Sequence, residues 1–321
     1  MRQTEGAAGA RILAFGGYQP ARVLTNDELA TMVDTNDEWI RSRVGIASRR
    51  IAGPDETVAD MAVNAGGKAL AASGLSSEDI DLIIVATCTP EAPIPNTAAT
   101  VARRLGIKAP GAYDLNAACA GFCYALASAS DAVRTGTARN VLVIGAEKLS
   151  QWIDWTDRST CIIFADGAGA VVVSPVSDPD EAGIGPVVWG SAGDMADKIY
   201  IPDRNGFIIQ EGQAVFRWAT TALHPVAKKA CERAGVDPTE LAAFVPHQAN
   251  LRIVEAIARK LGAPQALVAD DIVTAGNTSS ASIPLALARM LERGEIPSGA
   301  PVLLLGFGAG ICYAGQVIKV P

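Results

Sequence analysis

The chain repeats one arrangement of elements twice, and this duplication limits the possible fold more than any other feature. Residues 68–106 and 228–262 both read as a helix, a glycine, a short turn with acidic residues, an apolar strand, a loop and a second helix that ends in Leu-Gly. Three glycines of the first copy have counterparts in the second at nearly one spacing: Gly74 and Gly235, Gly106 and Gly262, and Gly145 and Gly306, which are 161, 156 and 161 residues apart. Such a repeat predicts two similar halves that pack against each other.

Short apolar strands rich in β-branched residues alternate with helices in both halves. The clearest are DLIIVAT (81–87), VLVIGAE (141–147), GAVVVS (169–174) and VLLLGF (302–307). This alternation predicts βαβ units with mainly parallel sheets, and therefore an α/β protein. Two such halves related by a pseudo-twofold axis form a layered α/β/α/β/α body. We place the halves at residues 10–175 and 176–321.

Two helices rich in small residues, 119–133 and 279–292, occupy equivalent places in the two halves. Residues 117–130 contain no charged side chain, whereas an exposed helix of this composition carries a Lys or Glu face. Small side chains also let helices approach one another closely. We therefore expect both helices at the buried centre of the molecule.

The charge and the cysteine and histidine content narrow the class of protein. The formal net charge is −7, which argues against general affinity for nucleic acid because phosphate binding needs an excess of Lys and Arg. Six cysteines without a CxxC pair and only two histidines argue against a zinc site. The N-terminus lacks the apolar segment of a signal peptide, and no apolar run reaches about 18 residues. The expectation is a cytoplasmic enzyme with no membrane segment, no metal and no nucleic-acid partner.

Cys119 stands where an apolar strand gives way to the first central helix. Three interpretations are open for such a residue: an inert buried thiol, one half of a disulfide, or a nucleophile. A cytoplasmic setting disfavours the disulfide. Two other polar groups occupy related places, because Gly276-Asn277 precedes the second central helix and His247 follows an apolar strand of the second half. Since α/β proteins place their sites at strand ends, we expect Cys119, His247 and Asn277 to converge.

These three residue types together suit acyl transfer through a covalent thioester. A helix N-terminus lowers the pKa of a thiol, and the thiolate is a nucleophile that forms acyl thioesters. A histidine can transfer a proton near pH 7, and an asparagine amide can polarise a carbonyl without titrating. The glycine-rich segment 304–310 lets backbone N–H groups approach a substrate closely. Taken singly, a Cys or His beside an apolar strand is usually structural, and we interpret His224 and the other five cysteines in that way.

Six stretches carry a resemblance to a known family: TNDEWIRSRVGIASRR, AACAGFCYAL, FADGAGAVVV, VPHQANLRI, TAGNTSSASIPLAL and GFGAGICYA. From near residue 10 to the C-terminus the chain resembles the β-ketoacyl-acyl-carrier-protein synthase III family of condensing enzymes, which implies the thiolase-like fold. The family's Cys-His-Asn triad falls on Cys119, His247 and Asn277. Elongating synthases of the same fold carry two histidines, so the His/Asn pair separates this chain from them.

The resemblance implies a ping-pong decarboxylative Claisen condensation that initiates fatty-acid biosynthesis. Cys119 takes an acyl group from a short-chain acyl-CoA. Malonyl-acyl-carrier protein then enters, and His247 and Asn277 hold its thioester carbonyl while CO₂ leaves. The carbanion attacks the Cys119 thioester and gives 3-ketoacyl-acyl-carrier protein. The backbone N–H groups of Cys119 and Ala309 hold the oxyanion. No metal or redox cofactor is implied, and acyl-CoA is a substrate.

The resemblance also implies where the substrates bind. Trp39, Arg43 and Arg158 match the family's CoA-binding residues, an aromatic plate for adenine and guanidinium groups for phosphates. Asn250, placed in the same group, matches the asparagine that braces the active site in the family. Ile94 aligns with the position that lines the acyl channel, where it leaves more room than the Phe of acetyl-preferring relatives.

One basic patch is expected in this acidic chain. Arg252 and Arg259 are seven residues apart in one helix and share a face, with Lys260 adjacent. Carrier proteins are acidic, so this face is a candidate docking surface, and the alternative is ordinary solvated helix charge. The family also pairs along the edge of the sheet in the first half, which implies a homodimer.

Three other functions stay open from the sequence. A starter-unit ketosynthase or acyltransferase of the same fold in polyketide biosynthesis uses the same chemistry. A transferase that acylates a hydroxyl or an amine releases no CO₂ from a malonyl substrate, which distinguishes it. A non-catalytic partner subunit typically lacks the cysteine, and all three residues of the triad are present here.

Overall fold

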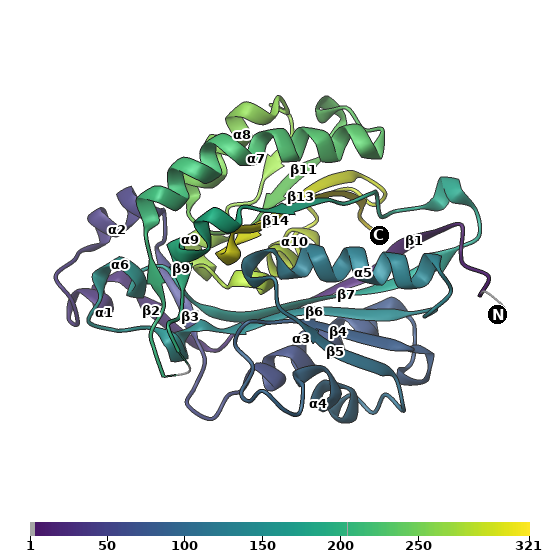
Figure 1. The fold of residues 1–321 in the computed structure, drawn as a ribbon, viewed down its shortest axis with the longest axis horizontal. Helices are drawn as coiled ribbons and strands as arrows, with labels where there is room; N and C mark the ends of the chain where they lie inside the picture. Colours follow the sequence, from purple (N-terminus) through teal and green to yellow (C-terminus); the bar gives the residue numbers. More distant parts are fainter. Residues whose placement is uncertain (1–3, 204) are drawn as a thin grey trace.

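The computed structural model describes residues 4–203 and 205–321 and contains two five-stranded sheets stacked with helices between them (Figure 1). The first sheet has the strand order β1-β7-β6-β4-β5. Its strands are β1 (Gly9–Tyr18), β4 (Leu82–Ala86), β5 (Gly111–Leu115), β6 (Val141–Lys148) and β7 (Asp166–Val176). The second sheet has the order β12-β11-β13-β14-β8. Its strands are β8 (Val188–Ser191), β11 (Ala243–Pro246), β12 (Leu267–Val268), β13 (Pro301–Gly308) and β14 (Cys312–Lys319).

The two sheets pair their strands in the same way, which confirms the duplication. Strand β4 is parallel to β5 and β6, as β11 is to β12 and β13. The remaining pairs, β6–β7, β1–β7, β13–β14 and β14–β8, are antiparallel. The prediction of mainly parallel sheets is therefore only half right. Three residues join β13 to β14, far fewer than the dozen or so that a parallel crossover needs.

Helices form the other three layers of a five-layer α/β/α/β/α body (Figure 1). The outer face of the first sheet is covered by α3 (Val58–Ser73) and α4 (Thr97–Arg104). The outer face of the second is covered by α7 (Gly212–Ala234) and α8 (Leu251–Leu261). Between the sheets lie α5 (Gly121–Arg134) and α10 (Ser282–Glu292), which are the two central helices predicted from the sequence.

The glycines matched between the two copies fall at two kinds of position. Gly74 and Gly235 end α3 and α7 with left-handed backbone, at φ of 75° and 68°, a conformation that a residue with a side chain rarely adopts. Gly145 instead faces the central layer, where a Cβ atom would lie 2.4 Å from the Ser280 carbonyl oxygen. The first sheet can therefore approach the central helices closely only because this residue has no side chain.

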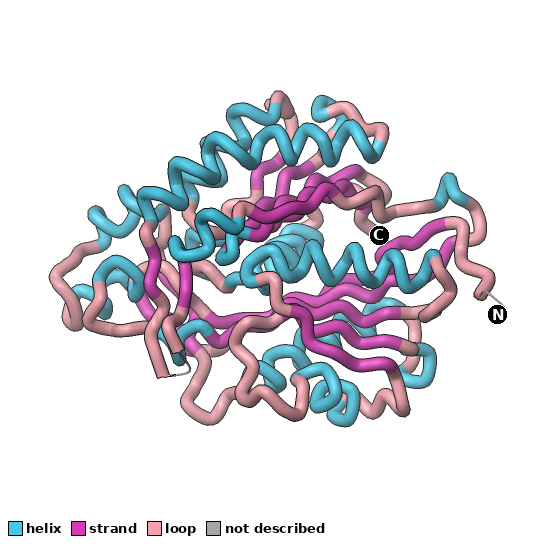
Figure 2. Tube along the Cα trace, viewed as in Figure 1, coloured by secondary structure: helices cyan, strands magenta, loops and turns pink. Residues whose placement is uncertain are grey.

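Shorter elements gather at one end of the molecule (Figure 2). They are β2 (Arg22–Thr25), α1 (Asn26–Ala30), α2 (Asp37–Val44), β3 (Ser48–Ile51), α6 (Arg158–Cys161), β9 (Ile199–Tyr200), β10 (Ile209–Gln210) and α9 (Ile272–Ala275). Several of them, with loops at the strand ends, line a cavity of about 970 Å³. In the part of the chain that the structure describes, no helix has both the length and the apolar character needed to cross a membrane.

Candidate active site

Cys119 lies in a 3₁₀ turn, η2 (Ala118–Ala120), that leads directly into the central helix α5. The turn begins with left-handed backbone at Ala118, φ 46°, so the chain changes direction sharply before the helix. Gly308 packs against the thiol, and a Cβ atom there would lie 2.9 Å from Cys119 Sγ. Cys119 lines the cavity and, like the other five cysteines, is free. The disulfide interpretation is therefore excluded.

The Cys119 thiol keeps its proton in the resting structure. Burial raises the pKa of Cys119 to about 12, and the Glu147 charge acts in the same direction. The Ser279 hydroxyl and the backbone N–H groups of Cys119 and Ala309 lower this pKa. The expectation that the helix N-terminus lowers this pKa is wrong, because desolvation of the thiolate outweighs the helix. The two N–H groups that act on the sulfur are those predicted to form the oxyanion hole.

His247 follows β11 and is buried, with its Nδ1 2.7 Å from Ser282 Oγ. Ser282 Oγ also accepts the Gln248 backbone N–H at 3.3 Å, so the hydroxyl hydrogen is available to the histidine. This arrangement is compatible with the tautomer that carries its hydrogen on Nε2. Burial lowers the pKa of His247 to about 3. A neutral imidazole at pH 7 can donate a hydrogen bond, and this low pKa runs against the expectation of proton transfer near pH 7.

Asn277 follows α9 and precedes the 3₁₀ turn η7 (Ser279–Ala281), which leads into α10. Its backbone pairs with the first half of the molecule: the N–H donates to the Ile163 carbonyl at 3.0 Å, and the carbonyl accepts the Ala165 N–H at 2.9 Å. Its side-chain Oδ1 accepts the Ser279 N–H at 2.9 Å. Because Oδ1 is occupied, Nδ2 is the part of the amide that can donate to a ligand.

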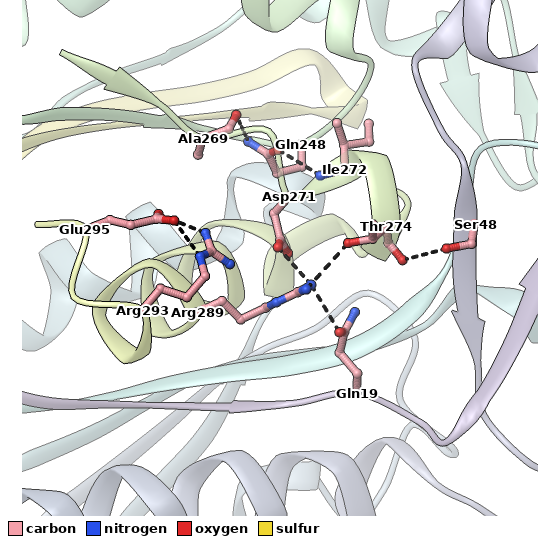
Figure 3. Close-up of polar contacts among 10 residues, drawn as sticks. All are labelled: Gln19, Ser48, Gln248, Ala269, Asp271, Ile272, Thr274, Arg289, Arg293 and Glu295. Atoms are coloured by element: carbon pink, nitrogen blue, oxygen red, sulfur yellow. Dashed lines mark hydrogen bonds and ion pairs between the residues drawn. The ribbon is translucent and has the colours of Figure 1, made fainter. Parts of the chain in front are cut away.

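Gln248 ties the histidine loop to the segment that contains α9 (Figure 3). Its Nε2 donates to the Ala269 carbonyl at 3.2 Å, and its Oε1 accepts the Ile272 N–H at 3.0 Å. The same segment is also held by an ion pair between buried Asp271 and Arg289 at 2.8 Å. These contacts fix the histidine loop and the asparagine loop relative to each other.

Trp39, Arg43 and Arg158 meet at the edge of the cavity. The guanidinium carbon of Arg158 lies 4.7 Å from the centroid of the Trp39 ring, and that of Arg43 lies 5.6 Å from it. Trp39 and Arg43 belong to α2 and line the cavity, whereas Arg158 begins α6. Asn250 caps α8 and donates to the Arg43 carbonyl at 3.2 Å. An aromatic ring with two guanidinium groups close to it suits a nucleotide with its phosphates.

Comparison with known proteins leads to the same family that the sequence motifs resemble. The model of 3-oxoacyl-[acyl-carrier-protein (ACP)] synthase III matches residues 113–193, and the model of the C-terminal part of the same enzyme matches residues 231–320. The chain is 58% identical over 313 residues to β-ketoacyl-[acyl-carrier-protein] synthase III 4 of Streptomyces coelicolor, and the match covers 98% of this chain and 99% of that protein. The chain belongs to the synthase III family.

Two solved structures are similar to this synthase III chain over nearly their whole length. The priming β-ketosynthase of a polyketide biosynthetic pathway is 43% identical with a TM-score of 0.96, and the match covers 100% of this chain and 98% of that one. The 3-oxoacyl-[acyl-carrier-protein] synthase III of Aquifex aeolicus is 43% identical with a TM-score of 0.93, covering 97% of this chain and 100% of that one. These matches confirm the family resemblance and the fold expected from it.

The predicted docking residues of this synthase III chain, Arg252, Arg259 and Lys260, are exposed on α8. Arg252 lines the cavity and packs over the Phe216 ring, with its guanidinium carbon 5.2 Å from the ring centroid. Arg259 lies 3.7 Å from Glu255, and Lys260 donates to a backbone carbonyl of α7 at 2.6 Å. Of the three, Arg252 is the one placed beside the cavity.

Ile94 is 84% exposed and lies outside the cavity of the single chain. The cavity wall is instead supplied in part by the segment that contains β9 and β10, through Ile199, Ile201 and Ile208. The prediction that Ile94 lines the acyl channel is therefore wrong for the single chain.

Sequence reasoning missed four side chains around the synthase III site: Cys88, Glu147, Ser279 and Ser282. The sequence context of Cys88 predicts a structural thiol, yet Cys88 lines the cavity. Glu147 ends a predicted apolar strand, where nothing in the sequence marks it. The duplication does hold a signal for Ser279, which stands 161 residues after Ala118. Both residues begin their turns with left-handed backbone, at φ of 51° and 46°.

Proposed function

We propose that this chain condenses a short-chain acyl-CoA with malonyl-acyl-carrier protein by decarboxylative Claisen condensation, giving 3-ketoacyl-acyl-carrier protein, CoA and CO₂ at the start of fatty-acid biosynthesis. As a member of the synthase III family, the chain is a condensing acyltransferase. One observation carries the proposal: Cys119, His247 and Asn277 come from three separate loops and line one cavity of about 970 Å³. Trp39 and its two arginines at the cavity edge support CoA as the carrier of the primer.

In the first half-reaction, Cys119 Sγ attacks the thioester carbonyl of acyl-CoA. The bond from Sγ to the acyl carbon forms, and the bond from that carbon to the CoA sulfur breaks. The oxyanion of this step is held by the backbone N–H groups of Cys119 and Ala309, which act on the sulfur in the resting structure. Gly308 leaves room for the acyl group, since a Cβ atom there would lie 2.9 Å from Sγ.

In the second half-reaction, the malonyl thioester loses CO₂ and becomes an enolate. Nε2–H of His247 and Nδ2–H of Asn277 donate to the thioester carbonyl, whose oxygen becomes negative as the carbon–carbon bond to CO₂ breaks. Both donors are neutral and buried, so their hydrogen bonds to a developing charge are stronger than they would be in bulk water. The enolate carbon then attacks the acyl group on Cys119 and releases Sγ.

A coupled assay tests this function. Malonyl-carrier protein labelled in its free carboxyl group is incubated with acyl-CoA primers that differ in chain length and branching. Labelled CO₂ and 3-ketoacyl-carrier protein should form in equal amounts when a primer is present. Transfer of the acyl group to a hydroxyl or an amine without release of CO₂ would contradict the proposal.

Polyketide priming is the second candidate function, because a priming polyketide ketosynthase matches this chain with a TM-score of 0.96. The chemistry is the same, so the carrier protein distinguishes the two functions. A higher kcat/KM with the carrier protein of fatty-acid synthesis than with a polyketide carrier protein supports fatty-acid initiation. The reverse order supports polyketide priming.

We also infer a homodimer that pairs along β5. In the residues that the structure describes, no strand pairs with the outer edge of β5, and such an edge invites pairing with another chain. Ile94 is close to this edge, because Asn96 donates to the Ala112 carbonyl of β5 at 3.0 Å. A second copy would cover exposed Ile94 and place it at the acyl channel. Sedimentation at micromolar concentration should give a dimer, and a monomer would contradict this inference.

Reversing the charge of Arg252 should impair the reaction with the carrier protein more than the reaction with acyl-CoA. Arg252→Glu should raise the KM for malonyl-carrier protein by about 10-fold, since rim charges steer the encounter of charged partners. Arg259→Glu should have a smaller effect, because Arg259 is farther along α8 and is paired with Glu255. Acylation by acyl-CoA should change little in either variant, because Trp39 and its arginines bind that substrate.

Steady-state kinetics at two salt concentrations check this docking prediction. The difference between Arg252→Glu and the wild-type protein should shrink as salt screens the wild-type attraction. Equal losses with malonyl-CoA and malonyl-carrier protein would show that the arginine supports the fold or the CoA site and that the carrier protein docks elsewhere.

A further inference from the structure

Arg49, in β3, is a fully buried cation that the condensation steps above leave unused. Its guanidinium donates to neutral acceptors: the Leu24 carbonyl at 3.3 Å, Asn26 Oδ1 at 2.8 Å and the Ile162 carbonyl at 3.0 Å. Among the residues that the structure describes, no carboxylate forms an ion pair with Arg49, and its Nε atom has no hydrogen-bond partner. Burial lowers the pKa of Arg49 to about 10, so the group keeps its charge at neutral pH. A charge held in the core by neutral groups is costly, so it points to a function.

Asn26 connects Arg49 to the helix α2. Its Oδ1 accepts the Arg49 hydrogen bond, and its Nδ2 donates to Asp37 Oδ1 and to the Ile46 carbonyl, at 2.8 Å each. Asp37 is the first residue of α2, and Ile46 follows the residue that caps its C-terminus. Asn26 is itself buried and therefore holds both ends of the helix that carries Trp39.

Ile162 connects Arg49 to the helix α6. It caps the C-terminus of α6, where backbone carbonyls lack partners inside the helix, and the guanidinium supplies a donor to its carbonyl. Helix α6 begins with Arg158, whose guanidinium carbon lies 4.7 Å from the centroid of the Trp39 ring. Helices α2 and α6 lie at the same end of the molecule (Figure 1). Arg49 is thus bonded, on its inner side, to both elements that bring Trp39 and Arg158 together.

The exposed side of this junction is held differently. Arg158 donates to the Asp34 carbonyl at 2.7 Å and lies 3.8 Å from the Asp34 carboxylate, whose side chain is fully exposed. Water and salt weaken such a contact, and Arg158 is also the residue that would meet a phosphate. The link through Arg49 is out of reach of solvent, so it is the one that can hold the two helices while a ligand occupies the site.

We propose that Arg49 is a positioning residue for the nucleotide of acyl-CoA, which holds Trp39 and Arg158 at the spacing that lets the enzyme prefer a primer thioester with a nucleotide to one without. Arg49 does not touch the ligand, because it is fully buried and does not line the cavity. This inference rests on the proposed function, in which CoA carries the primer. Malonyl-carrier protein has a phosphopantetheine arm and no nucleotide, so the second half-reaction should not depend on Arg49.

The variant that tests this role must keep the stem of the side chain. A Cβ atom at Gly276, which precedes Asn277, would lie 2.9 Å from Arg49 Cβ, so the stem packs against the asparagine loop. Arg49→Lys keeps this stem and the charge but loses the planar group whose several N–H donors reach acceptors on two sides. It therefore weakens the links to α2 and α6 with little change at the catalytic residues.

Single-turnover acylation of Cys119 with two primer donors measures the effect. One donor is acyl-CoA, and the other is the N-acetylcysteamine thioester of the same acyl group, which has no nucleotide. Arg49→Lys should raise the half-saturating concentration of acyl-CoA by about 10-fold, the size of one lost cation–π or charge-assisted contact, and leave the maximal rate unchanged. The second-order rate constant for the N-acetylcysteamine thioester should stay at the wild-type value, as should release of CO₂ from malonyl-carrier protein.

Arg50→Lys is the matched control. Arg50 is the next residue of β3, and its guanidinium donates to the Pro20 and Ala21 carbonyls, at 3.4 and 3.0 Å, in the loop before β2. The same exchange there should leave both primer donors unchanged.

Asp37→Ala tests the same link at a site that does not endanger the fold, because the Asp37 side chain is 43% exposed. This change removes the acceptor for Asn26 at the start of α2. It should raise the half-saturating concentration of acyl-CoA by about 3-fold and again spare the N-acetylcysteamine thioester. Arg49→Lys and Asp37→Ala variants that both use acyl-CoA as the wild-type protein does would overturn the proposal.

The remaining outcomes separate this inference from the proposed function. Equal losses with the two primer donors in Arg49→Lys would overturn the inference and leave Arg49 as a brace for the whole site. A wild-type protein that is acylated but does not prefer acyl-CoA to the N-acetylcysteamine thioester would overturn it as well, because no nucleotide is then recognised. A wild-type protein that forms no acyl-enzyme with either donor would instead refute the proposed function.

Equilibrium binding gives a readout that is independent of the chemistry. Isothermal titration with CoA and with pantetheine, which has the same thiol arm without the nucleotide, compares the two ligands directly. Arg49→Lys should raise the Kd for CoA by about 10-fold and leave the Kd for pantetheine unchanged. The same rise for both ligands would contradict a role at the nucleotide.

Discussion

Replacement of Cys119 by Ala should abolish the acyl-enzyme and lower the rate of condensation by at least about 10³-fold, as loss of a catalytic nucleophile does. The protein should stay folded, because the change removes one sulfur atom at the wall of a cavity and costs roughly 1 kcal/mol of stability. Mass spectrometry after incubation with acyl-CoA measures the first effect. Thermal unfolding measures the second.

Cys88→Ala is the matched control for this prediction, because Cys88 lines the same cavity. Acyl-CoA should still label Cys119 in that variant. A label on any cysteine other than Cys119 in the wild-type protein would show that the nucleophile is assigned wrongly. Cys119→Ala should still release CO₂ from malonyl-carrier protein, since His247 and Asn277 remain in place.

The layered fold could be predicted from local features that occur in both copies of the duplicated sequence. Gly74 and Gly235 mark helix ends because their left-handed backbone favours glycine, and this signal is readable without any tertiary contact. Strand direction is different. The antiparallel pairing of β13 and β14 depends on a three-residue connection, and the apolar runs on either side look the same for both directions.

The meeting of Cys119, His247 and Asn277 could be predicted because each stands at the end of an element in a duplicated plan. Their protonation states could not. Burial sets the pKa of Cys119 to about 12 and that of His247 to about 3. Burial is a property of the assembled layers, whereas the helix that follows Cys119 is visible in the sequence, so sequence reasoning kept the smaller effect and missed the larger one.

Glu147 was hidden for a related reason. Its donors belong to loops that are far away in the sequence: Thr87 lies 60 residues before it, and Ser279 lies 132 residues after it. In the sequence it is one acidic residue at the end of an apolar strand. Only the packing of the two halves shows that the carboxylate is buried and surrounded by donors.

Asn277→Ala and His247→Ala should each lower the rate of malonyl decarboxylation by about 10²–10³-fold, the usual cost of losing one donor to a developing oxyanion. Both donors serve one oxygen atom, so the double variant should lose less than the product of the two single losses. Acylation of Cys119 should persist in both single variants, because its oxyanion is held by backbone N–H groups. The Asn277 variant also loses the acceptor for the Ser279 N–H, so its thermal stability must be measured together with its kinetics.

The pH dependence of decarboxylation separates a hydrogen-bonding histidine from a titrating one. Burial lowers the pKa of His247 from its usual 6.5 to about 3, so the imidazole is neutral both above and below the usual value. The rate of CO₂ release by Cys119→Ala, which isolates this half-reaction, should therefore stay level between about pH 8 and about pH 5. An inflection near the usual pKa would show that His247 is protonated during turnover. In that case the donor at the malonyl carbonyl is an imidazolium, and the neutral state inferred from the burial of His247 is wrong.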